Sequence, residues 1–228
     1  MGIPAVVLAA LFVPARAPGD PASLLALSGW KLTLPEGQPD EIGPDRLRAF
    51  SHPDWFFVAP DGKGVVFRAP AGGATTKNSR YPRCELREMA AWSTARGRHV
   101  LDLVQAITRL PAKKPHVVAG QIHDATDDVV MIRLEGTHLF VEGGGKALGT
   151  LDRDYRLGTD FAIRLEASGG RVRVFYRDQE TPQVETSRAA EGCYFKAGVY
   201  TQSNPSRGED PAAVGEVVIR RLAVVHEP

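Results

Sequence analysis

Alternation of hydrophobic and polar residues is the dominant pattern of this chain from Trp30 onward. A strand sends successive side chains to opposite faces, so such a segment predicts a strand with one buried face. Alternating segments or short apolar runs occur at 64–68, 99–107, 161–167, 171–177 and 215–225. Stretches rich in glycine, proline and aspartate lie between them and predict turns, at 35–45, 69–82, 142–149 and 203–213. Many short strands separated by turns favour an all-β fold, a sandwich or barrel, as a single domain over residues 19–228.

Helix signals are sparse, and the clearest one lies close to the start of the chain. Asp20 followed by Pro21 is typical of a helix N-terminus, so we expect a short helical turn that reaches Leu27. Before it, an apolar run over 3–13 leads into Ala-Arg-Ala, which fits a signal-peptidase site. Residues 1–18 are therefore either the signal peptide of a secreted protein or an N-terminal arm on the domain. We expect secretion.

The charge balance and the length of the apolar run argue against two classes of partner, and the cysteine count limits the disulfides. The chain has 28 Lys and Arg against 27 Asp and Glu, a balance that argues against a nucleic-acid binder. Its one apolar run is too short to span a bilayer, so we expect no membrane partner, and we expect a monomer. Cys84 and Cys193 permit at most one internal disulfide, and the sequence leaves open whether it forms.

The segment YFKAGVYTQ, at 194–202, predicts a strand with two different faces. One face is apolar and reads as core; its residues are Cys193, Phe195, Ala197 and Val199. The other is cationic and phenolic, typical of a binding surface; its residues are Tyr194, Lys196, Tyr200 and Gln202, together with Gly198.

Two further strands carry polar side chains on one face. In RCELR, Arg83, Glu85 and Arg87 share a face, which fits either a solvated edge strand or an anion site ordered by ion pairs. In GQIH, Gln121 and His123 share a face. A histidine in a strand is more often structural than catalytic, yet its ordinary pKa near ~6.5 suits proton transfer. If these strands line one cleft, it attracts an anionic substrate.

Few reaction types fit the residues of such a cleft. The cleft lacks the pair of free carboxylates that glycoside hydrolysis needs, and the chain has neither a G-x-S-x-G elbow nor a phosphate-binding loop. The acidic run DATDD, at 124–128, lacks the ligand spacing of a calcium loop and reads as a solvated turn. Proton abstraction beside a carboxylate remains: cationic donors neutralise a uronate, a base removes its C5 proton and an acid protonates O4. The sequence therefore predicts β-elimination on a polyuronate.

These motifs resemble the alginate lyases of polysaccharide lyase family 7. That family has R-x-E-L-R, Q-I/V-H and Y-F-K-A-G-x-Y-x-Q strands in this order, and GWKLTLP at 29–35 is similar to its first strand. The resemblance implies a β-jelly roll of two antiparallel sheets with a concave substrate cleft, no metal and no cofactor. The chain departs from the family pattern at Cys84, where serine or threonine is common.

Site roles follow from the same resemblance. Arg83 and Gln121 are expected to neutralise the uronate, His123 to act as base, and Tyr200 to act as acid, or as acid and base for the other C5 epimer. The remaining residues of the set are expected to bind sugar or order the arginines: Glu85, Arg87, Tyr194, Lys196 and Gln202. Isoleucine in Q-I-H implies alginate with guluronate-containing blocks.

Three alternatives stay open. A lyase of the same fold acting on another polyuronate, such as glucuronan, would share the carboxylate-binding residues. A carbohydrate-binding module needs no proton-transfer pair, so His123 with Tyr200 disfavours it. A sandwich glycoside hydrolase lacks support because the acidic pair is missing.

Overall fold

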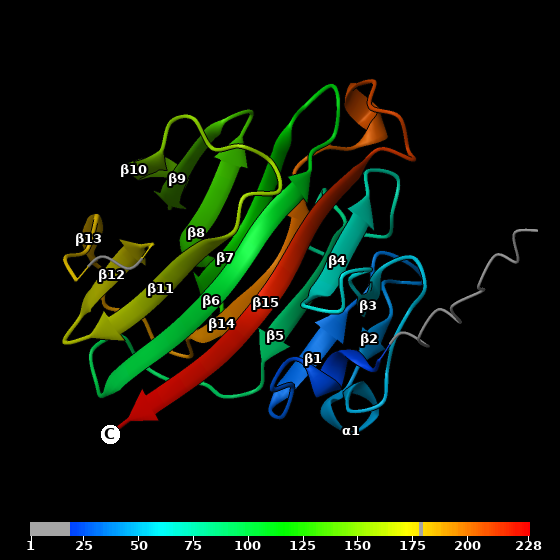
Figure 1. Ribbon diagram of the computed structural model, residues 1–228. Coiled ribbons are helices and arrows are strands. Elements are labelled where there is room, and N and C mark those ends of the chain that lie inside the picture. The colour runs from blue at the N-terminus through cyan, green and yellow to red at the C-terminus, as the bar shows by residue number, and fades with distance from the viewer. Residues whose placement is uncertain (1–18, 178–179) are drawn as a thin grey trace, which may run out of the picture.

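The computed structural model describes residues 19–177 and 180–228 and contains two antiparallel β-sheets packed face to face (Figure 1). The eight-stranded sheet has the order β10 (Lys146–Asp152), β9 (His138–Gly143), β8 (Asp128–Glu135), β7 (His116–His123), β14 (Tyr194–Thr201), β5 (Arg83–Glu88), β1 (Trp30–Thr33), β2 (Glu41–Ile42). The seven-stranded sheet has the order β13 (Val184–Ser187), β12 (Arg171–Tyr176), β11 (Phe161–Ser168), β6 (Arg98–Arg109), β15 (Val214–Glu227), β4 (Val65–Pro70), β3 (Phe56–Val58). The all-β sandwich expected from the alternating pattern is confirmed.

Helices are short and few in this part of the chain: η1 (Pro21–Ser23), α1 (Pro44–Leu47) and η2 (Pro205–Arg207). Asp20 caps η1 as expected, since its side chain accepts a hydrogen bond from the Ala22 N–H, but the helical turn ends before Leu27. No helix in the described ranges is long and apolar enough to cross a membrane. The expected signal peptide or arm, residues 1–18, lies outside the described residues.

Two stretches predicted as turns contain strands. Within 142–149 only Gly144 and Gly145 form the turn, and β10 begins directly after them at Lys146. Within 35–45 the short strand β2 pairs with β1. Both strands lie at an edge of the eight-stranded sheet, where pairing on one side only tolerates a weak hydrophobic pattern.

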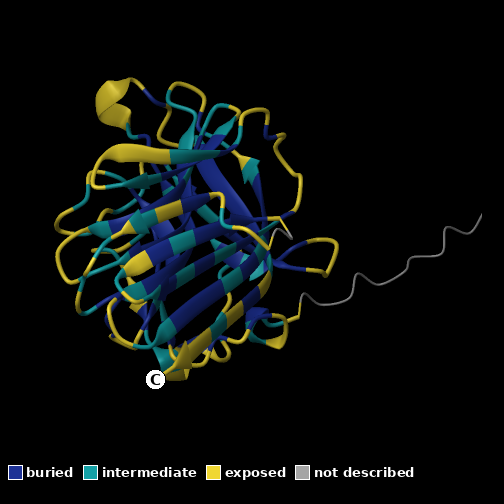
Figure 2. Ribbon diagram, turned by 90° about the vertical axis from the view of Figure 1, so that its left-hand side faces the viewer, coloured by how far each residue is buried: buried dark blue, intermediate teal, exposed yellow. Residues whose placement is uncertain are grey.

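The core lies between the two sheets, whose central strands are coloured mostly as buried in Figure 2. The apolar face of β14 belongs to this core. Phe195, Ala197 and Val199 are all fully buried, as the alternation predicts. On the facing sheet, Leu101 and Leu103 of β6 are buried in the same cluster. Burial of side chains of this size stabilises the fold by roughly 1.5–3 kcal/mol each, so these contacts hold the sheet that carries the polar face.

The two cysteines are both buried and free, so the disulfide that the sequence left open is not formed. The strands that carry them are neighbours, but Cys84 lies opposite Val199, whereas Cys193 pairs with Trp92. Cys193 and Val199 are six residues apart on an extended strand, which corresponds to about 20 Å. A disulfide needs Cα atoms within about 7 Å.

Gly198 lies at the centre of β14, directly opposite Glu85 on β5. Its φ is +130°, and a Cβ atom there would lie 2.5 Å from the carbonyl oxygen of Cys84. Glycine is therefore required by both the backbone conformation and the close approach of β5. A Cβ atom would also lie 2.9 Å from Phe67 of the core, so the glycine lets both β5 and the core approach β14 closely.

We expect Gly198→Ala to lower the free energy of unfolding by about 3 kcal/mol or more, since strain and collision add. Gly158→Ala is the matched control, because Gly158 also has a positive φ but a Cβ atom added there would meet no other atom within 4 Å. It should cost only about 1–2 kcal/mol. Denaturant unfolding of both variants measures the difference. Equal losses of unfolding free energy would show that the close contact with Cys84 adds no cost at Gly198.

Candidate active site

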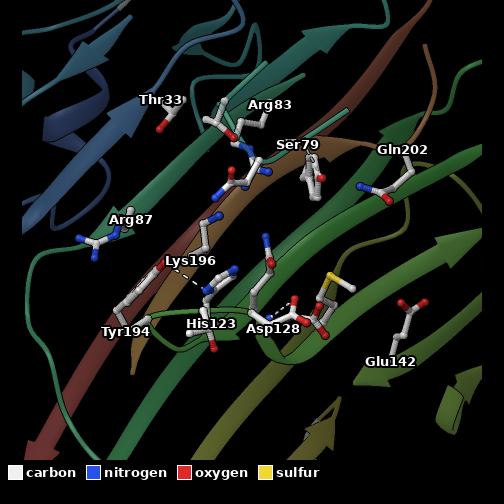
Figure 3. A pocket seen from close by; sticks show the side chains of 18 of the residues that line it. Thr33, Ser79, Arg83, Arg87, His123, Asp128, Glu142, Tyr194, Lys196 and Gln202 are labelled. Carbon is white, nitrogen blue, oxygen red and sulfur yellow. Dashed lines mark hydrogen bonds between the residues drawn. The ribbon is translucent and has the colours of Figure 1, made fainter. Parts of the chain in front are cut away.

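Three adjacent strands bring the predicted site residues to the outer face of the eight-stranded sheet. In the β14–β5 pair, Lys196 lies opposite Arg87 and Tyr200 opposite Arg83; in the β14–β7 pair, Lys196 also lies opposite Gln121. This register places side chains from distant parts of the sequence around a cleft of about 490 Å³ (Figure 3). The predicted residues that line it are Arg83, Arg87, Gln121, His123, Tyr194, Lys196, Tyr200 and Gln202.

Glu85 is the one predicted residue that does not line the cleft, because it is buried beneath the others with 1% of its surface exposed. Its Oε2 accepts a hydrogen bond from Arg83 Nη1 at 2.8 Å and lies 2.7 Å from Lys196 Nζ. Its Oε1 accepts a hydrogen bond from Gln121 Nε2. One carboxylate thus orients three side chains, each from a different strand.

Burial and ion pairing together determine the ionisation of Glu85 and Lys196. Burial raises the pKa of Glu85, but the opposing charges of Lys196 and Arg83 outweigh it and hold the pKa below its ordinary value. Burial lowers the pKa of Lys196, and Glu85 counteracts that effect. Glu85 is therefore ionised at neutral pH, and with Arg83 and Lys196 it leaves a surplus of positive charge under the cleft.

His123 has one ring nitrogen that is hydrogen-bonded and one that has no hydrogen-bond partner among the described residues. Its Nδ1 lies 2.7 Å from the backbone carbonyl oxygen of Asp124, which can only accept, so Nδ1 carries the proton and Nε2 the lone pair. The hydroxyl of Tyr194 lies 3.1 Å from the same Nδ1, and the two rings stack with centroids 5.4 Å apart (Figure 3). Burial, helped by the charge of Lys196, lowers the pKa of His123. The neutral ring with a free Nε2 suits a base.

Tyr200 is held at its ring and at its hydroxyl. The guanidinium carbon of Arg83 lies 3.8 Å from the ring centroid, a cation–π contact. The ring of Tyr81 approaches edge-on, with centroids 6.3 Å apart, and the hydroxyl lies 2.8 Å from Ser79 Oγ. The phenol is thus fixed in direction at the cleft.

Buried donors in the cleft have no partner among the described residues. Arg83 Nε and Gln202 Nε2 are buried nitrogens that donate to no atom there. Leaving a buried donor unsatisfied costs about 1–3 kcal/mol, so such donors call for an explanation. Both nitrogens have almost no accessible surface, so an oxygen of a bound ligand reaches them only if the side chains move.

Several cleft residues were missed by the sequence motifs. Lys31 and Arg133 line the cleft near its ends, each paired with a carboxylate: Lys31 Nζ lies 2.8 Å from Glu41, and Arg133 Nη1 lies 2.9 Å from Glu142. Lys31 belongs to the GWKLTLP strand, which did carry a signal, whereas β8 and β9 carried none. Ser79, from the loop between β4 and β5, lay in a stretch that predicted only a turn.

The acidic run at 124–128 forms a turn closed by its own side chain. Oδ1 of Asp124 accepts hydrogen bonds from the N–H groups of Thr126 and Asp127 at 2.7 and 2.8 Å. Among residues 19–177 and 180–228, no group of three His, Cys, Asp or Glu side chains is placed to hold a metal ion.

Comparison with known proteins gives a consistent result. The alginate lyase family model matches residues 25–226. The alginate lyase AlgAT5 of polysaccharide lyase family 7 is 50% identical, covers 91% of this chain and 99% of its own, and superposes with a TM-score of 0.89. The alginate lyase from Corynebacterium sp. is 39% identical over 93% of this chain and 100% of its own, with a TM-score of 0.88. An alginate lyase of Klebsiella pneumoniae is 27% identical over 92% of this chain and 93% of its own.

We expect Glu85→Gln to lower the free energy of unfolding by about 3–5 kcal/mol, because it leaves buried cations without a counter-charge. Glu185→Gln is the matched control: Glu185 also binds two arginines, Arg171 and Arg173, but on the solvent-exposed surface. That variant should unfold almost as the wild type does. Denaturant unfolding measures both variants, and equal losses of unfolding free energy would contradict the inference that Glu85 stabilises the buried cations.

Proposed function

The chain belongs to the alginate lyases of polysaccharide lyase family 7, and we propose that it cleaves guluronate-containing alginate with Arg83, Gln121, His123 and Tyr200 as its catalytic residues. One observation carries the assignment of roles. A buried carboxylate, Glu85, orients Arg83 and Gln121 beside a histidine whose Nε2 is free.

Arg83 and Gln121 are suited to neutralise the uronate carboxylate at the bond to be cleaved. Arg83 gives one N–H of its five to Glu85, while Gln121 keeps a second amide hydrogen. Removal of the C5 proton places negative charge on the carboxylate oxygens. Donors already aimed at those oxygens stabilise that charge without reorganising.

His123 and Tyr200 divide the proton transfers. The C5–H bond breaks and its proton goes to Nε2 of His123, while the electron pair is delocalised into the neutralised carboxylate. That pair forms the C4=C5 double bond as the C4–O4 bond breaks, and O4 takes the hydroxyl proton of Tyr200. The products are a new reducing end and an unsaturated uronate; His123 then loses its proton to solvent, and Tyr200 regains one from solvent. For mannuronate, whose C5 proton lies on the other side, Tyr200 is suited to act as both base and acid.

The guluronate preference has two supports, both from relatives. Ile122 stands at the position where the family's Q-I-H strand goes with guluronate-containing substrates; it is fully buried, so any influence acts through the position of β7. A family-7 alginate lyase that is 26% identical, A1-II′, has been crystallised with a product denoted GGG.

The first test is the ultraviolet absorbance of the conjugated product on separate polyguluronate, polymannuronate and glucuronan. We expect the fastest rise on polyguluronate, and a loss of kcat of about 10²–10⁴-fold in Tyr200→Phe, because the general acid is removed. Arg87→Ala is the control for general weakening of binding, and it should affect KM more than kcat. Wild-type turnover in Tyr200→Phe would remove Tyr200 from its role, and faster cleavage of polymannuronate would overturn the block preference.

The second test is the pH dependence of kcat/KM, which reports the groups of the free enzyme. Because burial lowers the pKa of His123, the base stays neutral into mildly acidic solution, and the acid limb should lie below the ordinary histidine value of ~6.5. Glu85, whose pKa is also lowered, should not titrate in that range. An acid limb at or above the ordinary value would contradict the assignment of His123 as base.

A further inference from the structure

The hydroxyl of Ser79 lies beside the hydroxyl of Tyr200, at 2.8 Å, although no motif of the sequence marked it. We propose that Ser79 is a positioning residue for Tyr200: it holds the tyrosine hydroxyl in the free enzyme and donates a hydrogen bond to the phenolate formed during cleavage. This inference rests on the proposed role of Tyr200 as the acid.

The protons of the free enzyme can be assigned from the neighbours of Ser79. Its Oγ lies 2.9 Å from the carbonyl oxygen of Tyr81, which can only accept, so the single hydroxyl proton of Ser79 points there. The backbone N–H of Tyr81 donates back to the same Oγ at 3.1 Å. The remaining contact must therefore have Tyr200 as donor, which turns its proton toward Ser79.

Ser79 is the hydroxyl partner of Tyr200 within the described residues. Arg83 and Tyr81 contact the ring of Tyr200 rather than its oxygen. Tyr81 is itself held by Lys114, whose Nζ donates to the Tyr81 hydroxyl at 3.1 Å and lies 4.8 Å from the ring centroid. The backbone that fixes Ser79 is thus anchored, and Ser79 is placed to respond when charge appears on the phenol oxygen.

Charge appears there when Tyr200 gives its proton to O4 of the substrate. The O–H bond of Tyr200 breaks, a new bond forms between that proton and O4, and the phenolate remains. Ser79 can then rotate about its Cβ–Oγ bond and turn its proton from the Tyr81 carbonyl to the phenolate, with no covalent change in Ser79. A hydrogen bond to an ionised oxygen is about twice as strong as a neutral one. Ser79 therefore acts on the chemical step, and substrate binding should not depend on it.

The test is steady-state kinetics of Ser79→Ala on the polymer that wild type cleaves fastest. We expect kcat to fall roughly 10- to 100-fold, with KM and the melting temperature unchanged. Ser79→Thr keeps a hydroxyl and should recover most of the loss. Ser23→Ala is the matched control, since it removes an exposed hydroxyl that donates to a backbone carbonyl, that of Asp20, in a segment that does not line the cleft.

Combination with Tyr200→Phe shows whether Ser79 acts through Tyr200. Phenylalanine forms no phenolate, so Ser79→Ala should add no further loss in that background. A wild-type kcat in Ser79→Ala, or an equal loss in both backgrounds, overturns the Ser79 proposal alone. Full activity in Tyr200→Phe overturns the role of Tyr200 and this inference together.

Discussion

The site of this lyase depends on one buried carboxylate. Glu85 has almost no solvent contact, and a lone carboxylate in such a place would cost several kcal/mol or lose its charge. Two cations and an amide compensate for that burial, and in doing so each is held in a single orientation. Because the cations outnumber the carboxylate, the same arrangement that satisfies Glu85 leaves a positive surface for a polyuronate.

The sandwich makes this arrangement available by separating the two faces of β14. The inner face joins the core and fixes the strand, while the outer face carries the polar groups. Gly198 lets β5 approach β14 closely, and Glu85 of β5 interacts with Lys196 on β14 and with Gln121 on β7. The packing of the core and the ion pairs of the site therefore both depend on the middle of β14.

Charge along the cleft is uneven, and this has a consequence for substrate binding. Near the ends of the cleft, Lys31 and Arg133 are each matched by a carboxylate. At the centre, Arg83 and Lys196 share one carboxylate, and Arg87 rests on the ring of Tyr194 with no carboxylate within 4 Å among the described side chains. Attraction of an anionic chain is thus strongest at the centre, where we propose that proton transfer takes place, and weaker at the paired ends.

Sequence alone determined the strands with clear alternation and the face to which each motif residue points. These are local properties, because side-chain direction in a strand has a period of two and needs no knowledge of the partner strand. The edge strands β2 and β10, whose patterns are weak, were predicted as turns.

Tertiary structure alone decided which strands are neighbours and in what register. That register left Cys84 and Cys193 too far apart to pair, placed Glu85 under the cleft rather than in it, and brought the Ser79 loop against Tyr200. The residues involved are separated by up to 121 positions in the chain. Contacts over such separations depend on the packing of both sheets, and no short stretch of sequence encodes them.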